Sequence, residues 1–149
     1  MKKHRTSLRV IYGDTDAMGL TYHSNYFRWF ETGRNEMFRD LGLPYSEIEK
    51  KGYFLPVSEC YCKFCTPVKY DDVIIIETWV DSKKKGGMKF EYTIYRKTEP
   101  HTGPAETEDA GKETLCARGF TIHAFLNDKG KVIRPPGFIT ELMENAQND

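Results

Sequence analysis

The residues best suited to chemistry lie between positions 12 and 26, where Asp14, Asp16 and His23 follow one another closely. A carboxylate can attack a carbonyl carbon, or it can activate a water molecule to do so. A helical pattern begins near residues 23–25, and a helix start presents unpaired backbone N–H groups and the positive end of its dipole. Such donors stabilise a carbonyl oxygen that gains negative charge. The stretch therefore predicts a reaction at a carbonyl group, with Asp16 as the candidate catalytic carboxylate and the backbone N–H groups at the helix start, near residues 23–25, as oxyanion donors.

Two other interpretations of the paired aspartates have to be weighed. Aspartate side chains commonly form turns with nearby backbone N–H groups, and this is the role expected for Asp14. The spacing also resembles the start of a calcium-binding EF-hand loop. The fifth and twelfth positions of that loop would be Met18 and Asn25, where the site needs an oxygen ligand and a bidentate glutamate. A calcium site is therefore rejected.

The elements around this stretch are predicted to be a short strand at 8–12 and a long helix at 26–41. Apolar residues recur along the helix at spacings of three and four, as a buried face requires: Tyr26, Phe30, Gly33, Met37 and Leu41. Gly33 in its middle costs about 1 kcal/mol relative to alanine. We therefore expect Gly33 to allow close approach of the helix to a sheet.

The remainder of the chain favours strands, at 54–64, 73–80, 88–95 and 113–126, and a short terminal helix at about 138–145. Consecutive strands joined by short turns are usually antiparallel neighbours. One helix cannot cover both faces of a five-stranded sheet. We expect an α+β fold in a single domain (1–149), with the sheet curled around the helix and a second copy of the chain covering more of its surface.

Composition and charge exclude several functional classes. The chain has 149 residues, 22 basic and 22 acidic side chains and a pI near 6.9, so no net field favours a nucleic acid or an anionic membrane. The basic residues 2–5 lack the apolar segment that follows them in a signal peptide. No apolar run approaches the ~20 residues that span a bilayer. We expect a cytoplasmic protein with reduced thiols.

The stretch 12–34 resembles the signature of the hotdog-fold acyl-CoA thioesterases. The residues that carry the resemblance are Tyr12, Asp14, Thr15, Asp16, Gly19, Tyr22, His23, Asn25 and Tyr26, followed by Trp29, Phe30, Glu31 and Arg34. The branch that it resembles contains 4-hydroxybenzoyl-CoA thioesterase and the Tol–Pal-associated acyl-CoA thioesterases; the latter carry His at the position of His23. The resemblance implies a long central helix wrapped by a curved five-stranded antiparallel sheet, paired into a homodimer or homotetramer.

The resemblance also implies roles for single residues. Asp16 falls at the position of the family's catalytic aspartate, and the backbone N–H of His23 at the position that polarises the thioester. The remaining motif positions are expected to bind the substrate: Gly19, Tyr22, Asn25 and Tyr26. For the two tyrosines, a place in the core or the pocket wall is the alternative. The implied partner is an acyl-CoA substrate, and neither a metal nor a cofactor beyond the substrate's own CoA is expected.

Other candidate residues have plainer interpretations. Glu31 is a rival carboxylate, but Arg28 and Arg34 lie three residues to either side, so ion pairing is the expected role. The cysteines do not match the ligand spacing of a structural zinc site and are expected to be small buried side chains: Cys60, Cys62, Cys65 and Cys116. Residues 83–85 are three lysines in a hairpin turn that could meet an acidic partner. Residues 98–112 are expected to form a long loop.

Two other functions remain open alongside acyl-CoA hydrolysis. An enzyme of the same fold could hydrolyse thioesters of acyl-carrier protein, with residues 83–85 as a docking site. A non-catalytic protein could bind acyl-CoA without turning it over, although a pure binder has no need of Asp16. The identity of the acyl group does not follow from the sequence.

Overall fold

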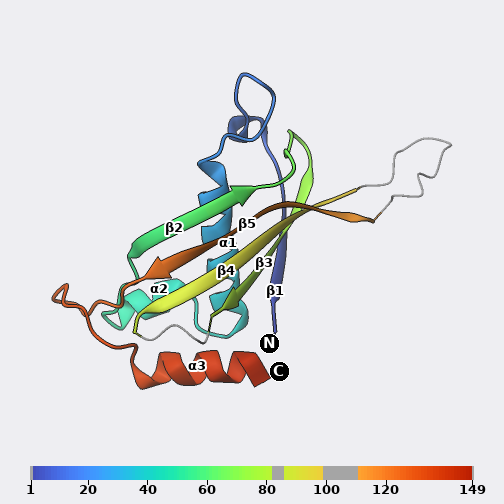
Figure 1. Ribbon diagram of the computed structural model, residues 1–149. Helices are drawn as coiled ribbons and strands as arrows, with labels where there is room; N and C mark the ends of the chain where they lie inside the picture. The colour runs from blue at the N-terminus through green and yellow to red at the C-terminus, as the bar shows by residue number, and fades with distance from the viewer. Residues whose placement is uncertain (1, 82–85, 99–110, 149) are drawn as a thin grey trace.

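The computed structural model describes residues 2–81, 86–98 and 111–148, and these form one antiparallel sheet with three α-helices (Figure 1). The strand order is β1-β3-β4-β5-β2, so the first two strands of the chain lie at opposite edges of the sheet. The strands are β1 (His4–Arg9), β2 (Val57–Phe64), β3 (Val73–Val80), β4 (Met88–Lys97) and β5 (Glu113–His123). The helices are α1 (Asn25–Asp40), α2 (Tyr45–Lys50) and α3 (Gly137–Asn148), with a 3-10 turn, η1, at Tyr12–Asp14. The α+β, five-stranded antiparallel architecture is confirmed.

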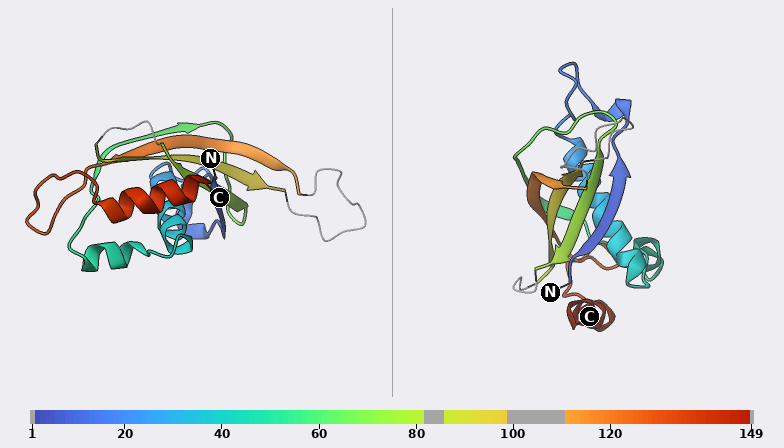
Figure 2. Two further views of the ribbon diagram at one scale, coloured as in Figure 1. Left: turned by 90° about the horizontal axis from the view of Figure 1, so that it is seen from below. Right: turned by 90° about the vertical axis from the view of Figure 1, so that its right-hand side faces the viewer.

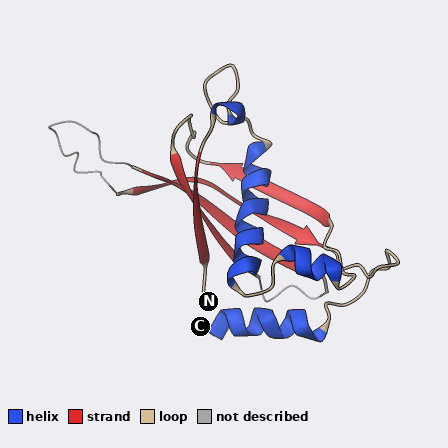
Figure 3. Ribbon diagram, turned by 180° about the vertical axis from the view of Figure 1, so that it is seen from behind, coloured by secondary structure: helices blue, strands red, loops and turns tan. Residues whose placement is uncertain are grey.

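The long helix α1 lies against one face of the sheet, and the sheet curves around it (Figures 2 and 3). Its buried side chains are those of the predicted apolar stripe and its neighbours: Tyr26, Trp29, Phe30, Met37 and Phe38. Gly33 faces β3, where an added Cβ would lie 2.5 Å from Thr78 Oγ1 and 2.7 Å from Ile76 Cγ2. The expected close approach at Gly33 is therefore confirmed.

The predicted first strand at 8–12 is wrong. β1 runs from His4 to Arg9 and pairs with β3 from His4 opposite Thr78 to Arg9 opposite Val73. The sequence of β1 does not show the usual alternation of apolar and polar residues, because the side chains of its more buried face include polar ones. Tyr12 has already left the sheet and is 73% exposed at the start of η1. The strand predicted at 73–80 has the observed ends of β3, and the other predicted elements are present with shifted ends.

A chain of polar side chains crosses the core between α1 and the sheet. Arg34 donates to the hydroxyl of Tyr92 (3.0 Å), which lies 2.7 Å from the hydroxyl of Thr121. Thr121 lies 2.8 Å from Nε2 of His123, whose Nδ1 lies 2.9 Å from the carbonyl oxygen of Leu55. A neutral imidazole that donates from Nδ1 and accepts at Nε2 satisfies every member of this chain. Its donors then all point from α1 toward Leu55.

Burial lowers the pKa of His123 to about 4, assisted by the charge of Arg34 and opposed by the hydrogen bond to Leu55. The unfolded chain binds the extra proton more readily, so the stability that neutral His123 contributes is present above its ordinary pKa and is lost as the pH falls toward 4. As the pH falls from 7 to 5, proton binding to His123 in the unfolded chain should lower the free energy of unfolding by about 2 kcal/mol. Urea unfolding at both pH values tests this: His123→Gln should show a pH dependence smaller by that amount. If His123→Gln had the same pH dependence of stability as the unchanged protein, His123 would not be buried as a neutral imidazole with a lowered pKa.

Candidate active site

The loop between β1 and α1 is organised around the side chain and carbonyl of Asp14. Its carbonyl oxygen accepts from the Tyr22 N–H (2.8 Å) and from the Asn25 side-chain amide (2.9 Å). Its carboxylate accepts from the Ile11 N–H (3.3 Å) and forms an ion pair with Arg28 of α1. Asp14 is 5% exposed. The prediction of a simple turn-former was therefore too narrow, since Asp14 also fastens both ends of the loop to the helix.

Replacing Arg28 with alanine should destabilise the fold. The change leaves the carboxylate of Asp14 buried without its cation, and Arg28 is itself half-exposed, so we expect the free energy of unfolding to fall by about 2 kcal/mol. Arg39→Ala is the matched control, because Arg39 pairs with Glu36 on the surface and should change stability by less than about 0.5 kcal/mol. Urea denaturation of both variants measures these losses. Equal losses would show that the buried pair of Arg28 and Asp14 contributes no more to stability than a surface ion pair.

Asp16 occupies a tight turn that leaves one carboxylate oxygen without a partner in the described chain. Its Oδ1 accepts from the N–H groups of Met18 (2.8 Å) and Leu20 (3.3 Å). Its backbone N–H donates to Leu20 (2.8 Å), and Gly19 donates to its carbonyl (3.0 Å). Gly19 has a φ of 77°, a left-handed conformation that glycine adopts without strain. The turn thus orients the carboxylate by one oxygen and leaves Oδ2 available to a ligand.

The start of α1 supplies hydrogen-bond donors beside this carboxylate. The N–H groups of Asn25, Tyr26 and Phe27 donate to the carbonyls three residues before them. Those of His23 and Ser24 have no acceptor among residues 2–81, 86–98 and 111–148. The His23 ring is exposed and lies 4.3 Å from the Tyr22 ring, centroid to centroid. Two unpaired donors therefore open the helix next to the loop that carries Asp16.

A pocket of about 310 Å³ joins these features. Its lining residues are Asp16, Met18, Leu20, Thr21, His23, Tyr26, Phe64, Cys65, Thr66, Pro67 and Val68. Tyr26 is buried and packs edge-on against Trp29 and Phe64, as the pocket-wall alternative supposed. Burial raises the pKa of Tyr26 to about 12, with smaller contributions from Cys116 and Cys62, so its phenol stays neutral. The pocket brings together three of the predicted site residues, Asp16, His23 and Tyr26.

The other three predicted site residues lie beside the pocket rather than in its lining. Gly19 makes the turn after Asp16, and Asn25 holds the Asp14 carbonyl. Tyr22 is 48% exposed and packs on the His23 ring. In this structure the observed contacts of Gly19 and Asn25 shape the loop.

Sequence reasoning missed the second wall of the pocket, residues 64–68 between β2 and β3. Thr21 donates from its N–H and its hydroxyl to the Val68 carbonyl (2.8 and 2.9 Å), and Leu20 bridges to Lys69. These segments are more than 40 residues apart in the chain, and no local pattern marks residues 64–68 as a binding surface.

The expected ion pairs of Glu31 are not formed. Among the described residues Arg28 pairs with Asp14, and Arg34 donates to Tyr92. Glu31 is exposed on α1 and does not line the pocket. The interpretation of Glu31 as an ion-pair partner is therefore wrong, because both arginines have partners that the sequence does not bring near them.

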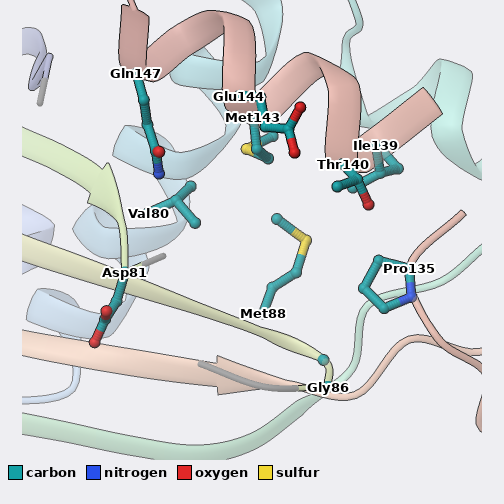
Figure 4. A pocket seen from close by; sticks show the side chains of 11 residues that line it. Val80, Asp81, Gly86, Met88, Pro135, Ile139, Thr140, Met143, Glu144 and Gln147 are labelled. Atoms are coloured by element: carbon teal, nitrogen blue, oxygen red, sulfur yellow. The ribbon is translucent and has the colours of Figure 1, made fainter. Parts of the chain in front are cut away.

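A second cavity, of about 320 Å³, lies between α3 and the β3–β4 end of the sheet (Figure 4). Its apolar floor comes from Val80, Met88, Ile139 and Met143. It lies at the end of the molecule opposite the loop of Asp16 (Figure 1), and none of its described lining residues is a histidine or cysteine. It has no counterpart to the arrangement around Asp16.

The described residues offer neither a metal site nor a membrane-spanning helix. Within the described ranges no three histidine, cysteine or acidic side chains gather in a way that could hold a metal ion. The cysteines there are free thiols: Cys60 and Cys65 are exposed, Cys62 is half-buried and only Cys116 is buried, so the expectation of four buried thiols is wrong. No described helix is both long and apolar enough to cross a bilayer. Residues 83–85 and most of the 98–112 segment lie outside the described residues.

Comparisons with known proteins identify the family of the chain. Residues 10–145 match the thioesterase-like superfamily. The chain is 35% identical over 95 residues to the "putative acyl-CoA thioesterase YneP" of Bacillus subtilis, which covers 64% of this chain and 69% of that protein. It is 26% identical to the 4-hydroxybenzoyl-CoA thioesterase of Pseudomonas sp. over 85% of this chain and 84% of that protein. The solved DHNA-CoA thioesterase of Staphylococcus aureus superposes with a TM-score of 0.82 at 25% identity, over 99% and 93% of the two chains. The chain therefore belongs to the thioesterase-like superfamily and is a hotdog-fold enzyme of the thioester hydrolase class.

Proposed function

We propose that this protein hydrolyses acyl-CoA thioesters at the pocket that Asp16 and His23 share. The observation that carries the proposal is the meeting of a half-satisfied carboxylate with unpaired N–H donors at a helix start, in one pocket of about 310 Å³. A thioester carbonyl needs both groups: a nucleophile or base at its carbon, and donors at its oxygen.

The mechanism follows from the roles of these groups. The carbonyl oxygen binds at the N–H groups of His23 and Ser24, where the positive end of α1 favours the developing charge. Oδ2 of Asp16 attacks the carbonyl carbon, or it takes a proton from a water molecule that attacks instead. The carbon–sulfur bond breaks and CoA leaves as the thiolate. The exposed ring of His23, a residue of the pocket lining, donates a hydrogen bond to the substrate in this proposal.

Assembly as a homodimer is part of this proposal. β2 is an edge strand, and seven of its eight residues are exposed, Val57, Tyr61 and Phe64 among them. An exposed edge with apolar side chains on both faces is a template for pairing with another strand. The β2 strand of a second copy would extend the sheet there, and β2 leads directly into the pocket wall at residues 64–68. A homodimer, or a homotetramer built from it, follows.

The finer family position is also a proposal. The side chain at position 23 is histidine, which supports the Tol–Pal-associated branch over the 4-hydroxybenzoyl-CoA branch. The free thiols support a cytoplasmic location. Catalysis would need no metal and no cofactor beyond the CoA of the substrate.

The test is thiol release from a panel of short, long and aromatic acyl-CoAs, with matched acyl-carrier-protein thioesters alongside. We expect hydrolysis of at least one acyl-CoA class at a rate well above that of its carrier-protein counterpart. Faster hydrolysis of the carrier-protein thioesters would favour the alternative substrate, and binding of acyl-CoA without thiol release would reduce the protein to a binder.

A further inference from the structure

The lining of the Asp16 pocket includes a cysteine that the proposed hydrolysis does not use, Cys65, whose sulfur lies 3.9 Å from the Lys63 carbonyl oxygen. Cys65 is an exposed residue of the pocket lining, directly after β2, and its backbone N–H donates to the Cys116 carbonyl (2.8 Å). That hydrogen bond fixes Cys65 beside β5 at the wall opposite the Asp16 loop. Any acyl-CoA that reaches Asp16 therefore brings its sulfur into a pocket that also holds Cys65.

Two further thiols surround Cys65, and both are kept protonated. Burial raises the pKa of Cys62 to about 12, with a smaller contribution from the charge of Cys65. Burial also raises the pKa of Cys116, and the charge of Cys65 adds to this shift. A protonated thiol is a poor nucleophile. Cys62 and Cys116 therefore lie near Cys65 but react slowly with any group attached to it at neutral pH.

We propose that Cys65 is a modification site at which CoA disulfide attaches one CoA to the enzyme as a mixed disulfide and closes the pocket. This inference rests on the proposed function, because it takes the pocket to bind CoA. The Cys65 thiolate attacks one sulfur of the CoA disulfide; the Cys65–CoA disulfide bond forms, the original disulfide bond breaks, and the second CoA leaves as a thiolate. The oxidant is the CoA disulfide itself, and the electrons balance.

The surroundings of Cys65 make its modification by CoA both selective and slow to reverse. CoA held in the pocket has a high effective concentration at Cys65, which a small disulfide such as glutathione disulfide lacks. The attached CoA occupies the space that the substrate needs. Cys62 and Cys116, as thiols rather than thiolates, do not readily displace it. An external reductant is then required to restore activity.

The experiment incubates the full-length enzyme with CoA disulfide, locates the added CoA by peptide mass spectrometry and follows thioester hydrolysis in the same samples. We expect CoA disulfide to modify Cys65 roughly tenfold faster than glutathione disulfide does. Cys60 is also exposed and lies outside the pocket lining, but it belongs to β2, the strand proposed to pair with a second copy, so it serves as a secondary comparison. Activity should fall in proportion to the fraction of modified Cys65 and return with dithiothreitol. The Cys65→Ser variant should lose none of its own initial activity on the same treatment, whereas Cys60→Ser should behave like the unchanged enzyme.

The readouts separate failure of this inference from failure of the proposed function. Equal modification of Cys60 and Cys65, or equal rates with the two disulfides, would overturn the inference while hydrolysis by the untreated enzyme stands. Selective modification of Cys65 without any hydrolysis would overturn the proposed function and leave the CoA pocket in place. The Asp16→Asn variant should bind acyl-CoA without cleaving it, so excess acyl-CoA should slow the modification of Cys65 but not that of Cys60. If acyl-CoA slowed both reactions equally, or neither, Cys65 would not share the substrate pocket.

Discussion

Asp16→Asn is expected to lower kcat for acyl-CoA hydrolysis by roughly 10²- to 10⁴-fold, because the amide can neither attack the carbonyl carbon nor accept a proton from water. The change should leave the fold intact. Asparagine retains an oxygen that can accept from the N–H groups of Met18 and Leu20, so the turn keeps its hydrogen bonds. Steady-state kinetics by thiol release, together with the unfolding midpoint, measures both effects.

The matched control for this variant is Asp128→Asn, which makes the same chemical change at an exposed position outside the pocket lining. It should leave kcat and KM unaltered. Asp14→Asn provides a contrast, since it weakens the buried pair with Arg28 and should lower stability as well as rate. Normal turnover by Asp16→Asn would remove Asp16 from the mechanism.

Gly119→Ala is expected to lower the free energy of unfolding by about 3 kcal/mol, because the added methyl group has nowhere to go. An ideal Cβ at Gly119 would overlap the Tyr61 carbonyl oxygen and lie 2.8 Å from the ring of Phe30. Phe30 stacks on Tyr92 at 4.3 Å between ring centroids, and Tyr92 is the neighbour of Gly119 on β4. The absence of a side chain at Gly119 thus leaves room for the ring of Phe30 where it stacks on Tyr92.

Urea denaturation of Gly119→Ala should be compared with Gly137→Ala, where an added Cβ meets no atom within 4 Å. The control should change stability by less than about 0.5 kcal/mol. Phe30→Leu combined with Gly119→Ala should recover only part of the loss, because the overlap with the backbone of β2 remains. Equal stability of the two alanine variants would show that β2 shifts away at little cost.

The sequence allowed the fold to be predicted wherever a pattern is local. The period of α1 and the position of Gly33 in it indicated a buried helix against a sheet, and the long strands β3 and β4 alternate clearly. β1 was misplaced because its inward residues include His4 and Thr6, which do not read as core. Their burial comes from the partner strand and from α1, neither of which is near in the chain.

The candidate site divides in the same way. Asp16 and the start of α1 share one continuous segment, so their meeting could be predicted. The partners of Asp14 and Glu31 could not be predicted, because Arg28, one of the two arginines expected to pair with Glu31, pairs with the buried carboxylate of Asp14. Cys65 and Val68 approach Leu20 and Thr21 only through the folded chain, and the sequence contains no signal for that contact.

The strand order indicates which part of the sheet can form first during folding. The consecutive strands β3, β4 and β5 lie together in the centre of the sheet, whereas β1 and β2 close its two edges. Neighbours in sequence pair with less loss of loop entropy than distant segments, so the central meander is the part best able to form early in folding. The pocket takes one wall from the segment after β1 and the other from the segment after β2. A chain in which either edge has yet to dock therefore has no pocket, and activity appears only when the last pieces of the sheet are in place.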